Sequence, residues 1–276
     1  MVIPHHRIRW RFQIVAAALF LVPVICFGGE NELWLLWKKH ISETTNHSAM
    51  VNACRHYAAE LPNDPLLPVV RGIEAWHMMS DGKKEEAARL LSPQLNGGPD
   101  ALARGAERVA RGWITRLQSE RVVDALKYYY RKEVRYPTVL KELVSYPGLP
   151  GADQLPLKDA WGRAWRYRLI GFEGVPGFQD QKYSLESGSI QPPLNPAAAL
   201  ALPYAEQINV HPSRVAGSGA PGDSPVVKLE FLDGANKGQS AIGQLGEEVA
   251  GITVADAGEF LVVLGDSLHW KIVAWK

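Results

Sequence analysis

The chain has 276 residues, of which 46% are hydrophobic and 21% are charged, and its 30 lysines and arginines are almost balanced by 29 aspartates and glutamates. This length is enough for one large domain or for two or three small ones, each with its own hydrophobic core. The formal net charge of +1 argues against nucleic acid as the main partner, because phosphate binding requires a clear cationic excess.

Only two cysteines, Cys26 and Cys54, are present, and they cannot form a disulfide framework or a metal cluster. Each folded part must therefore be stabilised by the burial of its own apolar side chains. We expect neither a metal ion nor a cofactor.

The N-terminal segment 1–39 carries a candidate membrane span. An uncharged run from Phe12 to Gly29 follows the cationic segment 7–11, and it has about the length that crosses a bilayer core. The cationic flank predicts that the chain after the run lies outside the cytoplasm. A signal peptide cleaved near Gly28 and a retained signal anchor both fit this pattern. The apolar residues 33–37, followed by two lysines, are typical of an interfacial belt and favour the anchor.

Residues 40–98 have helical periodicity, interrupted at Pro62–Pro65 and at Asp81–Gly82. Within them, LPNDPLLPVVRGIEAWHMMSDGKKEEAARLL (61–91) resembles a tetratricopeptide helical hairpin, which implies small residues where its helices approach: Gly72, Ala75 and Ala87. The sequence has no second repeat of this period, so a short helical module is expected rather than a solenoid. The cluster Trp76–Met79 is interpreted as core instead of a metal or haem site, because aromatic and methionine side chains at helical spacing usually pack together.

A long helix is predicted next, with Asp100 as its N-cap and its end near Glu133. The segment LPLKDAWGRAWRYRL (155–169) then begins as a turn around Asp159 and Gly162. It continues as a strand in which Trp165, Tyr167 and Leu169 alternate with arginines. A glycine-rich loop, Gly171–Gly177, leads to a second strand at Lys182–Leu185. These elements predict a small antiparallel sheet packed against the long helix.

Three pieces in this region resemble the major pseudopilin of type II secretion systems. They are SERVVDALKYYYRKEVRYPTVLKELV (119–144), LPLKDAWGRAWRYRL (155–169) and KYSLESG (182–188), in the order and spacing of that family. The resemblance implies that Asp159, Trp161 and Gly162 shape the turn and that Trp165 and Tyr167 hold the sheet on the helix. It also implies structural or docking roles for the residues of its Tyr-Pro-Thr and Tyr-Ser-Leu motifs, which are Tyr136, Pro137 and Tyr183.

The sequence departs from that family at two places. The apolar run lacks the glutamate with which the pseudopilin membrane helix begins, and about 70 residues separate it from the pseudopilin-like part. The calcium loop of the family follows its Tyr-Ser-Leu motif. Here this position holds Glu186, Ser187, Gly188 and Ser189, which supply too few hard oxygen ligands, so no calcium is expected.

The C-terminal part divides into a Pro/Ala/Gly-rich linker, 191–225, and a small all-β domain, 226–276. Strands are expected at Val227–Phe231, Gly251–Ala255, Glu259–Leu264 and Trp270–Trp275. This domain loosely resembles the periplasmic β-domains of secretion and pilus-assembly proteins that dock on an outer-membrane channel.

The whole chain is therefore predicted as α+β: a signal anchor (1–39), a helical module (40–98), a pseudopilin-like domain (99–190), the linker and the β domain. Catalytic motifs are absent from the sequence, and His56, His77, His211 and His269 lie in separate segments. The resemblance implies a non-enzymatic inner-membrane protein, single-pass and largely periplasmic, that binds secretion or pilus-assembly proteins. The alternative is an envelope scaffold with the same fold, and an enzyme would need a polar cleft between the domains. Arg166 and Arg168, with Lys158, fit either an acidic peptide or anionic headgroup or a solvated strand face.

Overall fold

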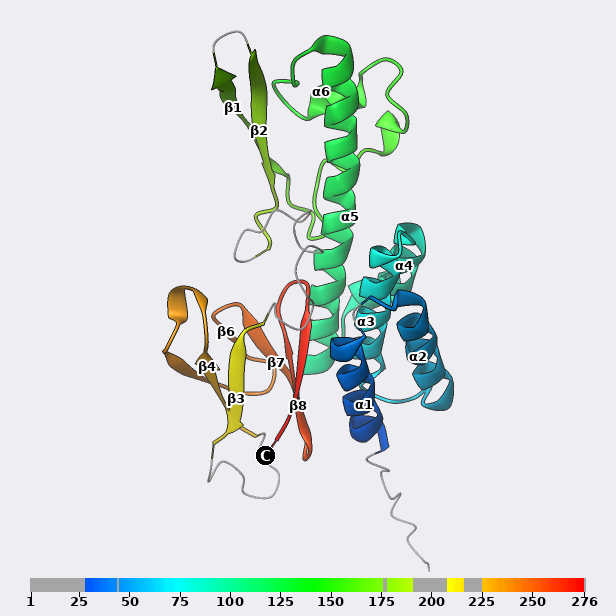
Figure 1. The fold of residues 1–276 in the computed structure, drawn as a ribbon, viewed down its shortest axis with the longest axis vertical. Coiled ribbons are helices and arrows are strands. Elements are labelled where there is room, and N and C mark those ends of the chain that lie inside the picture. Colours follow the sequence, from blue (N-terminus) through cyan, green and yellow to red (C-terminus); the bar gives the residue numbers. More distant parts are fainter. Residues whose placement is uncertain (1–27, 44, 176–177, 191–207, 216–224, 276) are drawn as a thin grey trace, which may run out of the picture.

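The computed structural model describes residues 28–43, 45–175, 178–190, 208–215 and 225–275. The fold is mixed α+β, with several helices and small antiparallel sheets (Figure 1). Its helices and short 3-10 turns are α1 (Gly28–Ser42), α2 (His47–Glu60), α3 (Leu67–Ser80), α4 (Lys84–Leu91), η1 (Ser92–Asn96), α5 (Ala101–Glu133), α6 (Lys141–Val144), η2 (Ala152–Gln154) and η5 (Gly234–Asn236).

Three antiparallel sheets follow the order β1-β2, β3-β4-β5 and β6-β7-β8-β9. Their strands are β1 (Arg166–Val175), β2 (Phe178–Glu186), β3 (Val210–Arg214), β4 (Val227–Phe231), β5 (Ser240–Gly243), β6 (Glu248–Val249), β7 (Ile252–Ala257), β8 (Leu261–Gly265) and β9 (Trp270–Ala274). The second and third sheets face each other and enclose the sandwich core, whose residues include Val210, Leu229, Val254, Val262 and Leu264.

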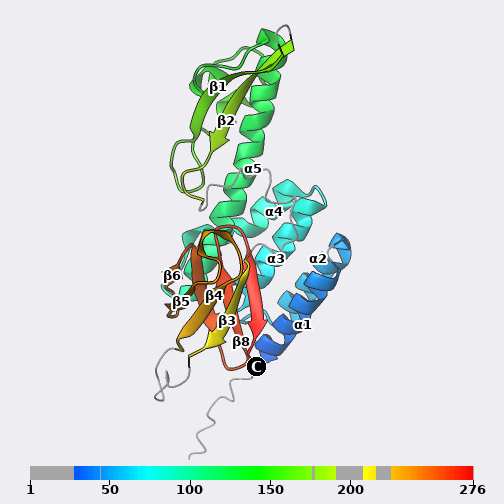
Figure 2. The ribbon, with the colours of Figure 1, turned by 60° about the vertical axis from the view of Figure 1, so that its left-hand side comes forward.

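The 33-residue helix α5 runs along the long axis of the molecule (Figures 1 and 2). The side chain of Asp100 caps it by accepting a hydrogen bond from the backbone N–H of Ala103, at 2.7 Å, which confirms the predicted start. Its N-terminal half packs on α3 and α4 and on strands β7 and β8, and its C-terminal half packs on α6 and the β1–β2 hairpin. One helix therefore serves two separate hydrophobic cores.

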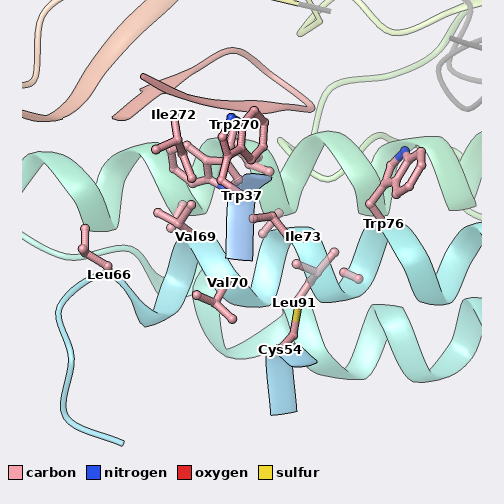
Figure 3. Close-up of a cluster of buried hydrophobic side chains, with 14 of the residues drawn as sticks. Trp37, Cys54, Leu66, Val69, Val70, Ile73, Trp76, Leu91, Trp270 and Ile272 are labelled. Carbon is pink, nitrogen blue, oxygen red and sulfur yellow. The ribbon is translucent and has the colours of Figure 1, made fainter. Parts of the chain in front are cut away.

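The larger of these, the helical core, lies between the helices and one face of the sheet β6–β9. Strand alternation explains its composition: Leu261, Val263 and Ile272 point to the helices, whereas Val262 and Leu264 point into the sandwich core. Figure 3 shows Trp270 and Ile272 of β9 among side chains of the helical core. The C-terminal sheet is thus covered on both faces.

The smaller one, the hairpin core, joins the C-terminal half of α5 to α6 and to β1–β2. It consists of Val122, Ala125, Leu126, Tyr129, Leu140, Leu143, Leu149, Trp165 and Leu185. Its residues on α5 begin five positions after the last α5 position that packs on the helical core, Leu117. The hairpin and the tip of α5 therefore project beyond the rest of the molecule (Figures 1 and 2).

Three sequence expectations are wrong. Leu33, Leu36 and Trp37 do not form an interfacial belt, because they are buried in the helical core. Residues 208–215 are not linker, because Ile208 and Val210 are buried in the sandwich core and β3 pairs with β4. Gly171–Val175 is not a loop but the second half of β1, paired with β2.

Other expectations fall on residues outside this description. These are most of the run Phe12–Gly29 and most of the predicted linker, 191–207 and 216–224. Among the described helices, none combines the length and the apolar character needed to span a membrane.

Candidate functional site

The turn before β1 is organised by the buried carboxylate of Asp159. Its Oδ1 atom accepts hydrogen bonds from the backbone N–H groups of Trp161 (3.0 Å) and Arg163 (2.9 Å), which confirms the turn predicted around Asp159. Its Oδ2 atom accepts hydrogen bonds from the hydroxyl groups of Ser187 and Ser189, each at 2.7 Å. Asp159 therefore joins the start of β1 to the chain that leaves β2.

Gly162 completes the turn with a φ of +80°, a backbone conformation that favours glycine. Ser187 and Ser189 lie where the resemblance to pseudopilins places a calcium loop. Hydrogen bonds from their hydroxyl groups to the Asp159 carboxylate connect this segment to the turn. The sequence could not reveal this link, because the partners are 28 and 30 positions apart.

Trp161 and Trp165 pack on different cores. Trp165 is buried in the hairpin core, and its indole N–H donates a hydrogen bond to the carbonyl oxygen of Pro156, at 2.8 Å. Trp161 is only partly buried and packs against the helical core instead. The two tryptophans thus connect one turn to both halves of α5.

The predicted docking residues Tyr136, Pro137, Tyr167 and Tyr183 come together beside the hairpin. The ring centroid of Tyr136 lies 4.6 Å from that of Tyr183, and the Tyr167 and Tyr183 rings are 6.0 Å apart. The Tyr167 hydroxyl donates a hydrogen bond to the carbonyl oxygen of Pro137, at 2.8 Å. Burial raises the pKa of Tyr167 and of Tyr183, so both phenols stay neutral and act as packing and hydrogen-bonding groups.

The opposite face of the hairpin is open to solvent. Arg166 and Arg168 of β1 are exposed there, in register with Glu186 and Ser184 of β2. These four residues and Tyr167 line a hollow of about 280 Å³. The two faces therefore have distinct chemistry: an aromatic face on α5 and a cationic face toward solvent.

A polar cleft lies where the hairpin part meets the sandwich. Its volume is about 590 Å³, and it is lined by Arg104, Glu107, Arg108, Arg111, Trp161, Ser189 and Glu248. This cleft is not predictable from the sequence, because its residues come from α5, the turn, the chain after β2, and β6.

The arginines of this cleft hold parts of the molecule together. Arg108 forms an ion pair with Glu248 at 2.5 Å and donates a hydrogen bond to Thr253 Oγ1 at 3.2 Å, which joins α5 to the sheet. Arg111 pairs with Glu107 and donates a hydrogen bond to the carbonyl oxygen of Ala160 in the turn. The cleft is therefore a joint between the two halves rather than an unpaired cationic site.

A chain of three histidines connects α1, α2 and α3. The Nδ1 atom of His40 lies 2.8 Å from Nε2 of His77, and the Nδ1 atom of His47 lies 3.0 Å from Nδ1 of His77. Because His77 uses one ring nitrogen for each neighbour, the three imidazoles do not converge on one point. Among the described residues, no group of three or more His, Cys, Asp or Glu side chains is arranged to hold a metal ion.

The reactive side chains of the helical core face inward. Cys54 and His77 are buried, and burial raises the pKa of the Cys54 thiol and lowers that of His77. Both are therefore neutral, and they pack in the core. Among the described side chains of β1 and β2, the exposed ones are those of Arg166, Arg168, Ile170 and Lys182.

The chain matches no protein-family model, no curated protein and no solved structure.

Proposed function

We propose that this protein is a non-enzymatic, membrane-anchored component of a type II secretion or type IV pilus-like assembly, and that it acts by docking on other proteins. In this proposal the segment before α1 is a single-pass anchor in the inner membrane, and the remaining chain lies in the periplasm. The partners are secretion or pilus-assembly proteins.

The observation that carries the proposal is the position of the β1–β2 hairpin at the tip of α5. The hairpin has its own core and projects beyond the helical and sandwich cores (Figure 2). Its aromatic face is used internally, which leaves the cationic face and the outer edge of β1 accessible. A long helix that carries a small hairpin beyond a larger body is suited to presenting a surface to a partner.

Two further observations support it. The residues that resemble the pseudopilin motifs, Tyr136, Pro137, Tyr167 and Tyr183, contact one another as a structural motif would require. Trp161 and Arg111 connect the turn before β1 to the N-terminal half of α5. The hairpin is therefore held at a defined place on the body instead of being tethered loosely.

Crosslinking in native membranes tests this function. The tagged full-length protein would be crosslinked, purified and analysed by mass spectrometry, with an unrelated tagged single-pass inner-membrane protein as control. We expect secretion-channel, pseudopilin or pilus-assembly subunits in the sample and not in the control, and we expect deletion of the gene to trap exported substrates. Recovery of unrelated envelope proteins alone would favour the scaffold alternative.

A further inference from the structure

Strand β1 has an unpaired edge. It belongs to a two-stranded sheet in which β2 pairs with only one of its sides. In Figure 1, β1 is the strand of the hairpin farther from α5, so its free side faces away from the helix. Within the described chain, the backbone of Arg166–Val175 forms no hydrogen bond outside the β1–β2 ladder. Such an edge can accept a further strand through main-chain hydrogen bonds.

The side chains beside this edge carry more positive than negative charge, because two arginines share the hollow with one carboxylate, that of Glu186. Arg166 and Arg168 are exposed, and within the described residues neither guanidinium group forms a hydrogen bond or an ion pair. The nearest carboxylate in register, that of Glu186, accepts a hydrogen bond from Ser184 at 2.9 Å instead. Two arginines therefore stand side by side on the solvent face, available to an anionic partner.

The spacing of these arginines indicates which positions of an added strand would carry acidic side chains. Alternate residues of a strand lie on one face about 6.6 Å apart, so an added strand places every second side chain beside Arg166 or Arg168. A bulge between Leu169 and Gly171 bends β1, which limits flat pairing to its first residues. A short extended segment with acidic residues at alternate positions fits both features.

We propose that the outer edge of β1 binds an extended acidic segment of a partner protein by β-strand addition, with its carboxylates on Arg166 and Arg168. This inference rests on the proposed docking function and names the chemistry of the partner. A second copy of β1 fits less well, because it would bring two more arginines to the same face.

Peptide binding to the full-length protein in nonionic detergent tests the inference. The probe is a fluorescein-labelled decapeptide with glutamate at alternate positions and threonine between them, followed by fluorescence anisotropy. We expect saturable binding that weakens at least about tenfold in the double variant Arg166→Glu/Arg168→Glu. The exposed Arg89 on α4 provides the matched control, and Arg89→Glu should bind the peptide as the unmodified protein does.

A second peptide separates strand addition from simple charge attraction. It keeps every glutamate but has proline in place of the threonines, which removes backbone N–H donors and prevents pairing. We expect this peptide not to bind. Equal affinity for both peptides, or equal binding of a lysine-substituted peptide, would overturn the inference.

The same samples also test two other possible ligands of the β1 edge, a lipid headgroup and a second copy of the chain. Displacement of the first peptide by short-chain phosphatidylglycerol, with the proline peptide binding equally well, would identify a lipid headgroup site and overturn strand addition. Self-association that Arg166→Glu/Arg168→Glu changes, without peptide binding, would identify a second copy as the occupant. If secretion subunits are still crosslinked when peptide binding is absent, only the β1 inference fails and the proposed function stands.

Discussion

Asp159 is the residue on which the turn before β1 depends most. Four donors share its carboxylate, and the residue is 4% exposed, so removal of the carboxylate leaves several buried polar groups without an acceptor. We expect Asp159→Ala to lower the free energy of unfolding by about 2–4 kcal/mol, measured by urea denaturation. Asp153→Ala, at an exposed position in η2, is the control and should change it by less than about 0.5 kcal/mol. Equal stability of the two variants would contradict this role.

The histidine chain makes the stability of the helical core depend on pH. Burial lowers the pKa of His40 to about 4 and that of His77 to about 3, with the neighbouring histidines adding to the effect on His77. In the unfolded chain both groups titrate near 6.5, so below this pH the unfolded state binds protons that the folded state does not. The stabilising contribution of the two neutral histidines is therefore fully present above about pH 6.5 and is lost as the pH falls toward 4.

We expect the free energy of unfolding to decrease by on the order of 2 kcal/mol per buried histidine between pH 7 and pH 5. His77→Phe should be less stable at pH 7, because it removes a buried hydrogen-bond partner of His40, but its stability should fall less steeply with acid. His56→Phe, at an exposed position on α2, should keep the original slope. Denaturation curves at several pH values measure how the free energy of unfolding depends on pH. The same dependence in the unmodified protein and both variants would refute the role of His77.

The residue-scale features differ in how far the sequence predicts them. The turn at Asp159 and Gly162 is predictable, because its hydrogen bonds and its positive φ involve residues within four positions of each other. The contacts of Asp159 with Ser187, and of His40 with His77, are not predictable, because tertiary packing brings together residues that are 28 and 37 positions apart.

At the scale of elements, two glycines of α5 allow the C-terminal sheet to approach the helix. A Cβ atom added at Gly112 would overlap the backbone carbonyl oxygen of Ser267, in the β8–β9 turn. One added at Gly105 would lie 3.1 Å from the Trp270 ring and 3.2 Å from Ala255 Cβ, where side chains can adjust. Both glycines are inside a helix, where glycine alone is unfavourable. Their presence there reflects the close packing of β7–β9.

Gly112→Ala should therefore destabilise the protein by more than about 2 kcal/mol, although the same change in an open helix stabilises it by about 0.5–1 kcal/mol. Gly105→Ala is the matched comparison and should cost less, because its neighbours are side-chain atoms. Thermal and urea denaturation of both variants shows which of them is less stable. A Gly112→Ala protein as stable as the original would show that the sheet does not sit on α5 in this way.

The elements were predictable where local signals and burial agree. Helix α5 has an Asp100 cap and a regular apolar stripe, and β4 has the burial alternation that its sequence predicts. Strand β3 has a proline and lies in a region that resembles a linker, so only its pairing with β4 identifies it. The burial of Leu33, Leu36 and Trp37 in the helical core is not predictable, because an apolar helix face has the same sequence pattern whether lipid or protein covers it.

At the scale of the whole molecule, α5 connects two cores that should respond separately to mutation. Trp165 is buried in the hairpin core, and truncation of a buried tryptophan costs about 3–5 kcal/mol. We expect Trp165→Ala to remove most hydrogen-exchange protection from 119–186, while α1–α4 and the sandwich keep theirs. Mass spectrometry of exchanging peptides measures both regions in one sample.

Trp161→Ala provides the contrast, because Trp161 is only partly buried and packs across the joint against the helical core. Its loss removes contacts between the two halves while Trp165 still fills the hairpin core. We therefore expect protection to fall in the turn 156–164 and at the N-terminal part of α5 around Arg111, which bonds to that turn, but to persist in β1 and β2. If Trp165→Ala exposed all regions together, the hairpin and the body would form one cooperative unit. The hairpin would then be part of the body rather than a separately stabilised surface for partners.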